Sequence, residues 1–210
     1  MGKKRKDHLP GKTIERLSQY RRILLVKLAG GKTNVFSHEL AKWLNLTSVQ
    51  VRRDLMLIDC SGSQSKGYSV GDLVYRIASI IDSKSALNLA VVGMGNLGRA
   101  ITSYFSGKRD KLSIVAVFDN DTQKTDRIIS GVPCFHINSV KEKIEADNIS
   151  MAILTVTPEA AQDVAKILVD SGIKGILNYT TVPISVPDEV YLEEYDMVTS
   201  LEKLAYFVNT

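Results

Sequence analysis

The sequence predicts an α/β protein in which an amino-terminal winged helix-turn-helix precedes a Rossmann-like parallel sheet domain and a separate carboxyl-terminal helix. Three observations support this prediction. Short amphipathic helices and basic residues fill the first part of the chain, a glycine-rich loop joins an apolar strand to a helix near its middle, and strands alternate with helices from there on. We expect the first domain at 1–84, the second at 85–196 and the last helix at 197–210.

The composition is typical of a globular chain that needs neither disulfide bonds nor a structural metal to fold. Hydrophobic residues make up 44% and charged residues 24% of its 210 residues. Cys60 and Cys134 lie far apart and have no partners at metal-ligand spacing, which argues against a disulfide framework and a metal site. No apolar run approaches the roughly 20 residues that cross a bilayer. We therefore expect a cytoplasmic protein with neither a metal nor a membrane partner.

The net charge of +4 conceals a strong asymmetry along the chain. Residues 1–80 carry 15 Lys+Arg against 6 Asp+Glu, whereas residues 81–210 carry 12 against 17. A basic half of this kind is typical of a polyanion-binding module, although a solvated basic surface would give the same balance.

Three short helices are predicted in the basic half, followed by a linker helix. The predicted helices cover Thr13–Ala29, His38–Leu44, Val49–Ile58 and Leu73–Ile81. The expected amino-terminal caps are Thr13, Ser37, and either Thr47 or Ser48, in chain order. Gly30 and Gly31 are expected to end the first helix.

The second and third helices have helix-turn-helix spacing, so the third is the candidate recognition helix. Gln and Arg suit the adenine and guanine edges of the major groove. The polar, glycine-rich stretch 61–70 is interpreted as a wing that lies along the DNA backbone. The candidate DNA contacts are Ser48, Gln50, Arg52 and Arg53 on the helix, and Gln64 and Lys66 in the wing. A three-helix bundle with an exposed basic helix is the alternative.

The middle of the chain predicts a dinucleotide-binding βαβ unit. The strand Leu87–Val92 leads into a glycine loop, a helix over Arg99–Phe105 and a second strand over Leu112–Phe118. The loop residues are Gly93, Met94, Gly95, Asn96, Leu97 and Gly98. Its glycines permit a tight turn, close approach to a pyrophosphate, and close helix–strand packing. Asp119 is expected to accept hydrogen bonds from the adenosine ribose, and Asp119 and Asp121 to repel the extra phosphate of NADP. We therefore expect NAD(H) as the cofactor.

The alternation continues with strands at Met151–Val156 and Gly175–Tyr179 around a helix over Pro158–Asp170, which Gly172 is expected to cap. Ligands of such sheets bind beyond the carboxyl ends of the strands. The candidate residues there are Thr155, Val156, Thr157, Asn178 and Tyr179. The final segment, Thr199–Val208, is apolar on most sides and needs a covering surface.

Several of these motifs, in this order, closely resemble the Rex family of bacterial redox-sensing transcriptional repressors. They are Gln50–Leu55, Gly67–Val70, the loop Gly93–Gly98, Phe118–Asp121, Ile153–Val156 and Gly172–Asn178. The resemblance implies a homodimer that binds operator DNA when NADH is scarce, releases it when NADH binds, and exchanges its carboxyl-terminal helix between subunits.

By position within this resemblance, Asp196 precedes the exchanged helix and Arg22 lies on the first helix. Our hypothesis is a switch in which Asp196 pairs with Arg22 in the DNA-bound form and with Tyr104 when NADH is bound. Tyr104 would then border the nicotinamide end of the cleft. The alternative is that Arg22 contacts a phosphate and Asp196 only caps the last helix. The chain departs from the family in two places: Gln64 and Lys66 stand in a wing without the usual arginine, and Tyr179 stands where the family has phenylalanine.

Two other function classes use the same glycine loop. One is an NAD-dependent dehydrogenase, but the Tyr104 and Lys108 pair comes too early in the chain for that chemistry, and no acid–base pair presents itself. The other is a regulator that binds coenzyme A instead of NADH. We expect a regulator without catalytic residues.

Overall fold

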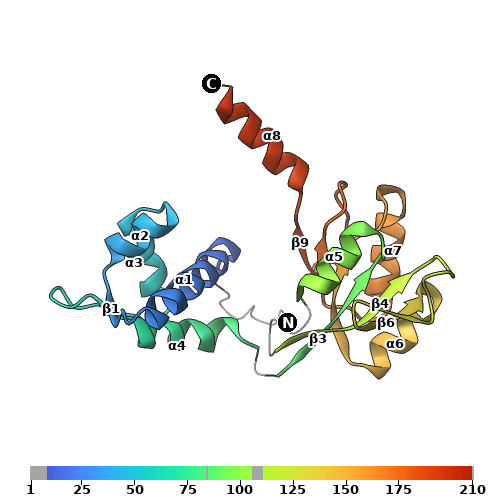
Figure 1. The fold of residues 1–210 in the computed structure, drawn as a ribbon, viewed down its shortest axis with the longest axis horizontal. Coiled ribbons are helices and arrows are strands. Elements are labelled where there is room, and N and C mark those ends of the chain that lie inside the picture. The colour runs from blue at the N-terminus through green and yellow to red at the C-terminus, as the bar shows by residue number, and fades with distance from the viewer. Residues whose placement is uncertain (1–8, 84, 106–110, 210) are drawn as a thin grey trace, which may run out of the picture. The chain divides into compact units, whose positions relative to one another are not determined.

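The computed structural model describes residues 9–83, 85–105 and 111–209 (Figure 1). The chain divides into two compact units, with the division directly after Ser83. We call them the amino-terminal unit and the carboxyl-terminal unit. Lys108, considered above with Tyr104, lies outside the described residues.

The amino-terminal unit consists of four helices and a small antiparallel sheet. Its elements are α1 (Gly11–Ala29), β1 (Asn34–Val35), α2 (Ser37–Leu44), α3 (Ser48–Met56), β2 (Tyr68–Ser69) and α4 (Val70–Ile81). Helix α1 packs along α4 and α2 packs against α3, while Asn34 of β1 pairs with Ser69 of β2. Fully buried Leu17, Leu24, Leu55 and Ile77 belong to the shared core.

The predicted helices are present, but two of the predicted caps are wrong. Helix α1 begins at Gly11, so Thr13 lies inside it, buried, where its hydroxyl accepts a hydrogen bond from Arg16 (3.2 Å). Ser37 is the first residue of α2, and the Glu39 carboxylate accepts from the Phe36 N–H (2.8 Å) at that end. A longer acidic side chain in the first turn thus does the work expected of the serine.

The ends of α3 and α4 also refine the predictions. Thr47 caps α3, accepting from the Gln50 N–H at 3.1 Å, and α3 ends at Met56 rather than at Ile58. Helix α4 begins at Val70 and not at Leu73, because the Ser69 hydroxyl accepts from the Asp72 N–H (3.3 Å) and starts the helix earlier.

The carboxyl-terminal unit is built on a seven-stranded sheet in the order β5-β6-β4-β3-β7-β8-β9, parallel throughout except for the β5–β6 pair. The strands are β3 (Leu87–Val92), β4 (Leu112–Asp119), β5 (Arg127–Ile129), β6 (Val132–His136), β7 (Ile149–Leu154), β8 (Gly175–Asn178) and β9 (Tyr191–Glu194). The helices are α5 (Asn96–Phe105), α6 (Val140–Ala146), α7 (Pro158–Asp170) and α8 (Met197–Val208), with a 3-10 turn at Ile137–Ser139. The predicted parallel α/β architecture is confirmed.

Helices cover both faces of this sheet. Ala90 and Val92 of β3 pack with residues of α6 and α7, whereas Val91, between them, packs with Ile101 of α5. Successive residues of a strand point to opposite faces, so the two clusters assign α5 to one face and α6 and α7 to the other.

Element ends in this unit differ from the predictions by a few residues. Helix α5 begins at Asn96 instead of Arg99, and β7 spans Ile149–Leu154 instead of Met151–Val156. Strand β8 ends at Asn178 rather than at Tyr179. The carboxyl-terminal cap of α7 is Ser171 rather than Gly172, which follows it with a φ of +96°.

Helix α8 has no buried residue in the described chain. Leu201, Leu204, Phe207 and Val208 are all at least 60% exposed. In the part of the chain that the structure describes, no helix is both long enough and apolar enough to cross a membrane.

Candidate nucleotide and nucleic-acid sites

A cavity of about 350 Å³ lies beside the glycine loop in the carboxyl-terminal unit. Parallel strands β3, β4 and β7 deliver their carboxyl ends to its edge, which is where ligands of such sheets bind. The predicted residues that line it are Gly93, Gly95, Asp119, Thr155, Val156 and Thr157. Residues that line it without having been predicted include Lys124, Ile137, Ala160, Val164 and Ile167.

The glycine loop is shaped by close backbone contacts. Gly93 has a φ of +97°, and a Cβ at this position would lie 2.7 Å from the Thr155 carbonyl oxygen. A Cβ on Gly98 would collide with the carbonyl oxygen of Gly93, whereas a Cβ on Gly95 would meet nothing within 4 Å. Thr155 Oγ1 holds the loop from β7, 2.7 Å from the Gly93 carbonyl oxygen to which it donates. Gly93 and Gly98 therefore serve the fold, and Gly95 leaves open space at the cavity.

Asp119 at the end of β4 is the buried charge of this site, with a relative exposure of 6%. Its carboxylate accepts from the Met94 N–H (2.7 Å) and the Asp121 N–H (2.9 Å), and Lys124 Nζ lies 3.2 Å away. Burial alone would raise the pKa of Asp119, but these two amides and Lys124 outweigh it and lower that pKa. The carboxylate is therefore ionised at neutral pH.

Lys124 reaches both oxygens of Asp119, at 3.3 and 3.2 Å. If Lys124 moves, one acceptor position on each oxygen becomes available while both amides stay bound. A carboxylate with one open acceptor position on each oxygen can accept from two neighbouring hydroxyl groups. Asp121 is more peripheral: it accepts from the Gln123 N–H (2.9 Å), lies 3.5 Å from Lys124, and is absent from the cavity lining.

Several predicted cofactor contacts do not line this cavity: Met94, Asn96, Leu97, Gly98, Asp121, Tyr104, Asn178 and Tyr179. Asn178 is 1% exposed, and its amide already binds the Val182 carbonyl (2.9 Å) and the Thr180 hydroxyl (2.7 Å), so it holds a turn. The Tyr179 ring lies 5.0 Å from that of Tyr195, and burial raises its pKa, with a further contribution from Tyr195. Tyr104, near the end of α5, is 62% exposed.

The predicted DNA contacts lie on α3 and on the segment that follows it. Arg52 and Arg53 are exposed, and Arg52 Nη1 donates to the Ser37 hydroxyl at 3.2 Å. Gln50 is half-buried, and its amide donates to Asp54 (2.9 Å); Ser48 is the first residue of α3. No ion pair engages Arg52, Arg53 or Lys66 among the described residues, so their charges are available to a polyanion.

The predicted wing is a tight hairpin. Ser63 pairs with Gly67, and exposed Gln64 and Lys66 lie in the turn between them. The Asn34 side chain donates to the Lys66 carbonyl (3.2 Å), which ties the hairpin to β1.

The residues of the implied switch lie on different units. Arg22 is exposed on α1 of the amino-terminal unit. Asp196 caps α8 of the carboxyl-terminal unit, where it accepts from the Val198 N–H (2.8 Å) and from the Thr199 hydroxyl, and the Thr199 hydrogen bond lowers its pKa.

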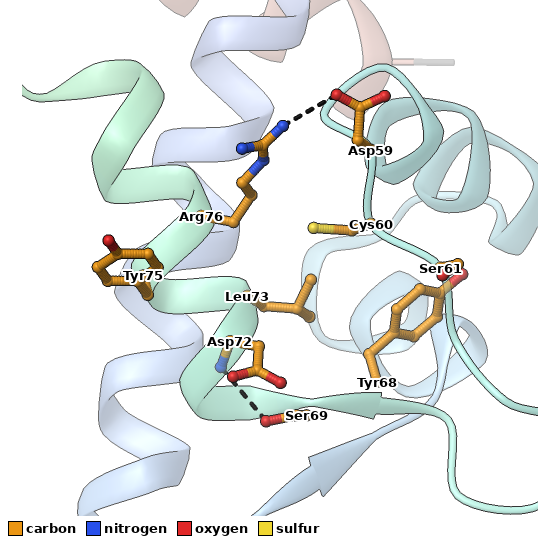
Figure 2. A pocket seen from close by; sticks show the side chains of 9 residues that line it. All are labelled: Asp59, Cys60, Ser61, Tyr68, Ser69, Asp72, Leu73, Tyr75 and Arg76. Carbon is orange, nitrogen blue, oxygen red and sulfur yellow. Dashed lines mark hydrogen bonds and ion pairs between the residues drawn. The ribbon is translucent and has the colours of Figure 1, made fainter.

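A second cavity, of about 530 Å³, lies in the amino-terminal unit between α4 and the segment after α3 (Figure 2). Arg76 pairs there with Asp59 at 2.9 Å and donates to the Ile58 carbonyl at 2.8 Å. Burial raises the pKa of the Cys60 thiol, which keeps it protonated at neutral pH. Among the described residues, no group of His, Cys, Asp or Glu is arranged to hold a metal ion, here or elsewhere.

Comparison with known proteins gives matches to both units and to the whole chain. The family described as "CoA binding domain" matches residues 84–182, and the family described as "Putative DNA-binding protein N-terminus" matches residues 8–55. A "Redox-sensing transcriptional repressor Rex" of Lactobacillus acidophilus is 36% identical, covering 98% of this chain and 97% of its own. A protein of the same description from Streptococcus mutans is 37% identical, covering 96% of this chain and 95% of its own.

Solved structures agree with the sequence matches. RSP, described as a Rex-family repressor, has a TM-score of 0.86 at 29% identity over 97% of this chain and 95% of its own. RSP in complex with β-NAD+ and operator DNA gives a TM-score of 0.89 at 30% identity over 97% of this chain and 94% of its own. RSP in complex with β-NADH gives a TM-score of 0.85 at 30% identity over 97% of this chain and 96% of its own.

Proposed function

We propose, because this chain belongs to the Rex family of redox-sensing transcriptional repressors, that it binds operator DNA as a homodimer and releases the DNA when NADH binds. The protein is a regulator and not an enzyme, as its relatives are named repressors. We infer that it acts in the cytoplasm, where bacterial DNA lies.

The assignment of DNA binding to residues 1–84 is supported by exposed arginines of α3 that form no ion pair within the part of the chain that the structure describes. Arg52 and Arg53 are exposed on the helix whose spacing predicts base reading, and Lys66 stands at the tip of the hairpin. Neutralising phosphates with such side chains releases counterions and supplies affinity, and contacts to base edges supply specificity.

The assignment of NAD(H) binding to residues 85–196 is carried by one observation: the ionised Asp119 carboxylate lines the cavity beside the open backbone of Gly95. Amides at the start of α5 and the positive end of its dipole would receive the pyrophosphate. Asp119 would receive the adenosine ribose hydroxyls in place of Lys124.

The same carboxylate argues against coenzyme A and NADP. Both carry an additional phosphate on the adenosine ribose, which would approach Asp119 and Asp121 with like charge. The match to the CoA-binding family therefore reflects the shared architecture, and complexes of the related RSP with β-NAD+ and β-NADH favour a nicotinamide ligand.

The preference for NADH over NAD+ follows from charge. The two differ at the nicotinamide ring, which is cationic when oxidised, so an apolar pocket near Tyr104 and the carboxyl-terminal segment would favour the neutral reduced form. In the proposed switch, the protein therefore binds the operator when NADH is scarce and releases it when NADH binds.

A fluorescence anisotropy titration tests the proposal. The wild-type protein first selects an inverted-repeat duplex from a randomised pool, and the complex is then titrated with NADH, NAD+, NADPH and coenzyme A. We expect NADH to release the duplex at the lowest concentration. Release by coenzyme A but not by NADH would replace the ligand, and steady oxidation of NADH in the presence of a carbonyl substrate would indicate a dehydrogenase instead.

A further inference from the structure

A carboxylate is buried beneath the candidate recognition helix. Asp54 lies on the inner side of α3 with a relative exposure of 0%. Arg16 binds it with both arms of its guanidinium, Nε to Oδ2 at 2.6 Å and Nη2 to Oδ1 at 2.7 Å. The Tyr20 hydroxyl donates to Oδ2 at 2.8 Å. A buried charge is stable only when it is paired and hydrogen-bonded, and Asp54 meets both conditions.

The fourth donor to this carboxylate is Gln50, one turn before Asp54 on α3. Its Nε2 lies 2.9 Å from Asp54 Oδ1. Each carboxylate oxygen thus accepts two hydrogen bonds, so the acceptor capacity of Asp54 is filled. Of the four residues in this network, Gln50 alone is also a candidate DNA contact.

The chemistry of Asp54 fixes which way the Gln50 amide points. Burial alone would raise the pKa of Asp54, but hydrogen bonds from Arg16, Tyr20 and Gln50 and the charge of Arg16 outweigh it and lower that pKa. An ionised carboxylate only accepts hydrogen bonds, so the amide nitrogen of Gln50 must face Asp54. Its carbonyl oxygen, Oε1, is left for an outside partner.

The other members of the network come from α1 and are themselves fixed. Arg16 and Tyr20 are four residues apart, so they lie on the same face of α1. Tyr20 is fully buried, and Arg16 also donates to the buried Thr13 hydroxyl at 3.2 Å. Through Asp54, the position of the Gln50 amide is therefore fixed relative to α1.

We propose that Arg16, Tyr20 and Asp54 are positioning residues for base reading, because they hold Gln50 with Oε1 and its remaining N–H presented to an adenine edge. Adenine offers an N6 donor and an N7 acceptor in the major groove, the complement of that amide edge. An unheld amide would rotate and present either end. This inference rests on the proposed operator binding.

The test uses the full-length protein and the duplex that the wild-type protein selects from a randomised inverted-repeat pool. Affinities are measured for that duplex, for derivatives changed at one base pair each, and for an unrelated duplex. Gln50→Ala identifies the base pair that Gln50 reads, where discrimination should fall about tenfold or more. The test variant is Tyr20→Phe, which removes one donor to Asp54 and keeps the ring. Tyr75→Phe makes the same chemical change at a side chain that is 77% exposed on α4 and serves as the matched control.

We expect Tyr20→Phe to lower discrimination severalfold at the Gln50 base pair and nowhere else, with unchanged affinity for the unrelated duplex. Tyr75→Phe should bind like the wild type. The Gln50→Ala/Tyr20→Phe double variant should discriminate as Gln50→Ala does, because the network then has nothing to position. In ¹⁵N-labelled wild-type protein, one side-chain amide proton of Gln50 should exchange slowly with solvent, a measurement that needs no variant to fold.

Wild-type discrimination in Tyr20→Phe overturns the inference, and so does an equal loss at every base pair, which would indicate a purely structural role. Rapid exchange of both Gln50 amide protons in the wild type also overturns it. A wild-type protein that binds the selected and unrelated duplexes equally would instead overturn the proposed function, and this result is seen before any variant is made.

Discussion

For Asp119 the structure adds a contact that the sequence does not suggest. A carboxylate at the end of the second strand was predicted to bind the ribose, and the structure adds that the same group ties down the Met94 N–H of the glycine loop at 2.7 Å. Lys124 was not predicted, because it reaches the carboxylate through a turn in which its own N–H binds the Asp121 carbonyl (2.9 Å). The spacing of these residues in the sequence does not reveal that the turn brings Lys124 back to Asp119.

Asp119→Ala should therefore weaken NADH binding about tenfold to a hundredfold, as expected from losing hydrogen bonds of about 1.5–3 kcal/mol to a charged group. Operator binding should remain but become insensitive to NADH, since the amino-terminal unit is untouched. Anisotropy titration measures both quantities, with Asp121→Ala, outside the cavity, as the milder control. Release of DNA at the wild-type NADH concentration would show that Asp119 does not bind the ribose.

Asp54 makes the stability of the amino-terminal unit depend on pH. Its pKa is lower in the folded state than in the unfolded chain, where it is about 3.9. The stabilisation is therefore complete above the unfolded value and is lost as pH falls through the folded value. Asp54→Asn should lose about 3 kcal/mol at neutral pH, because Arg16 is left without its counter-charge, and should show a flatter acid dependence.

Trp43, the single tryptophan of the chain, lies in the amino-terminal unit and reports its unfolding by fluorescence. Urea unfolding of both proteins between pH 3 and pH 7 measures the difference. Parallel pH dependences in the wild type and in Asp54→Asn would mean that other carboxylates govern the acid response.

At the scale of elements, segments with a clear apolar pattern were predictable, and several short segments without one were not. Strands β3 and β4 and the loop between β3 and α5 were found, because buried apolar runs flank a glycine pattern. Strands β5, β6 and β9 and helix α6 were not assigned from the sequence. They have only three to seven residues, β6 contains Pro133, and β5 and β9 lie at the sheet edges. Tertiary contacts rather than a local sequence pattern therefore form them.

The residues predicted to line the cavity were also only partly correct. Residues that follow β3 and β7 line the cavity as predicted, since parallel strands bring their carboxyl ends together. Asn178 also lies at the carboxyl end of a parallel strand, β8. Its amide nevertheless bonds to Val182 and Thr180 instead of facing the cavity. The rule locates an edge of the sheet, but side-chain hydrogen bonds within each loop decide which residues face a ligand.

The strand–loop–helix element supplies a pair of contrasting variants. Gly98→Ala places a Cβ against the Gly93 carbonyl oxygen, so it should destabilise the carboxyl-terminal unit by about 3 kcal/mol or more. Gly95→Ala has open space and should fold normally, but its methyl group would occupy the approach of the pyrophosphate and abolish NADH binding. Thermal unfolding and NADH titration separate the two effects, and tight NADH binding by Gly95→Ala would move the pyrophosphate elsewhere.

At the scale of the whole molecule, we expect α8 to pack against a second copy of the chain. None of its residues is buried in the described chain, although Leu201, Leu204 and Phe207 are large and apolar. Deleting residues 197–210 should convert a dimer into a monomer and weaken binding to an inverted repeat more than binding to a single half-site. Sedimentation velocity measures the first effect, with Lys203→Ala as a control in the same helix. A truncated chain that still sediments as a dimer would assign the interface to another surface.

The last prediction concerns how NADH binding reaches the DNA-binding unit. Changing a repressor from 1:99 to 99:1 released requires about 10⁴-fold preferential NADH binding to the released state, or about 5.5 kcal/mol. Some contact must therefore differ between the two states. Arg22 is exposed on α1, and Asp196 stands at the start of α8, the two positions implied for a partner exchange that also involves Tyr104.

Asp196 also caps α8, so its charge and its capping must be separated experimentally. Asp196→Asn keeps a good cap for the Val198 N–H while removing the charge, because asparagine and aspartate cap helices about equally well. A double-mutant cycle with Arg22→Ala, read as operator affinity with and without NADH, measures the coupling. We expect the double variant to lose less operator affinity than the two single losses combined, and only without NADH, since the pair exists only in the DNA-bound form. Additive losses in both conditions would mean that Arg22 contacts a phosphate independently and that Asp196 only caps the helix.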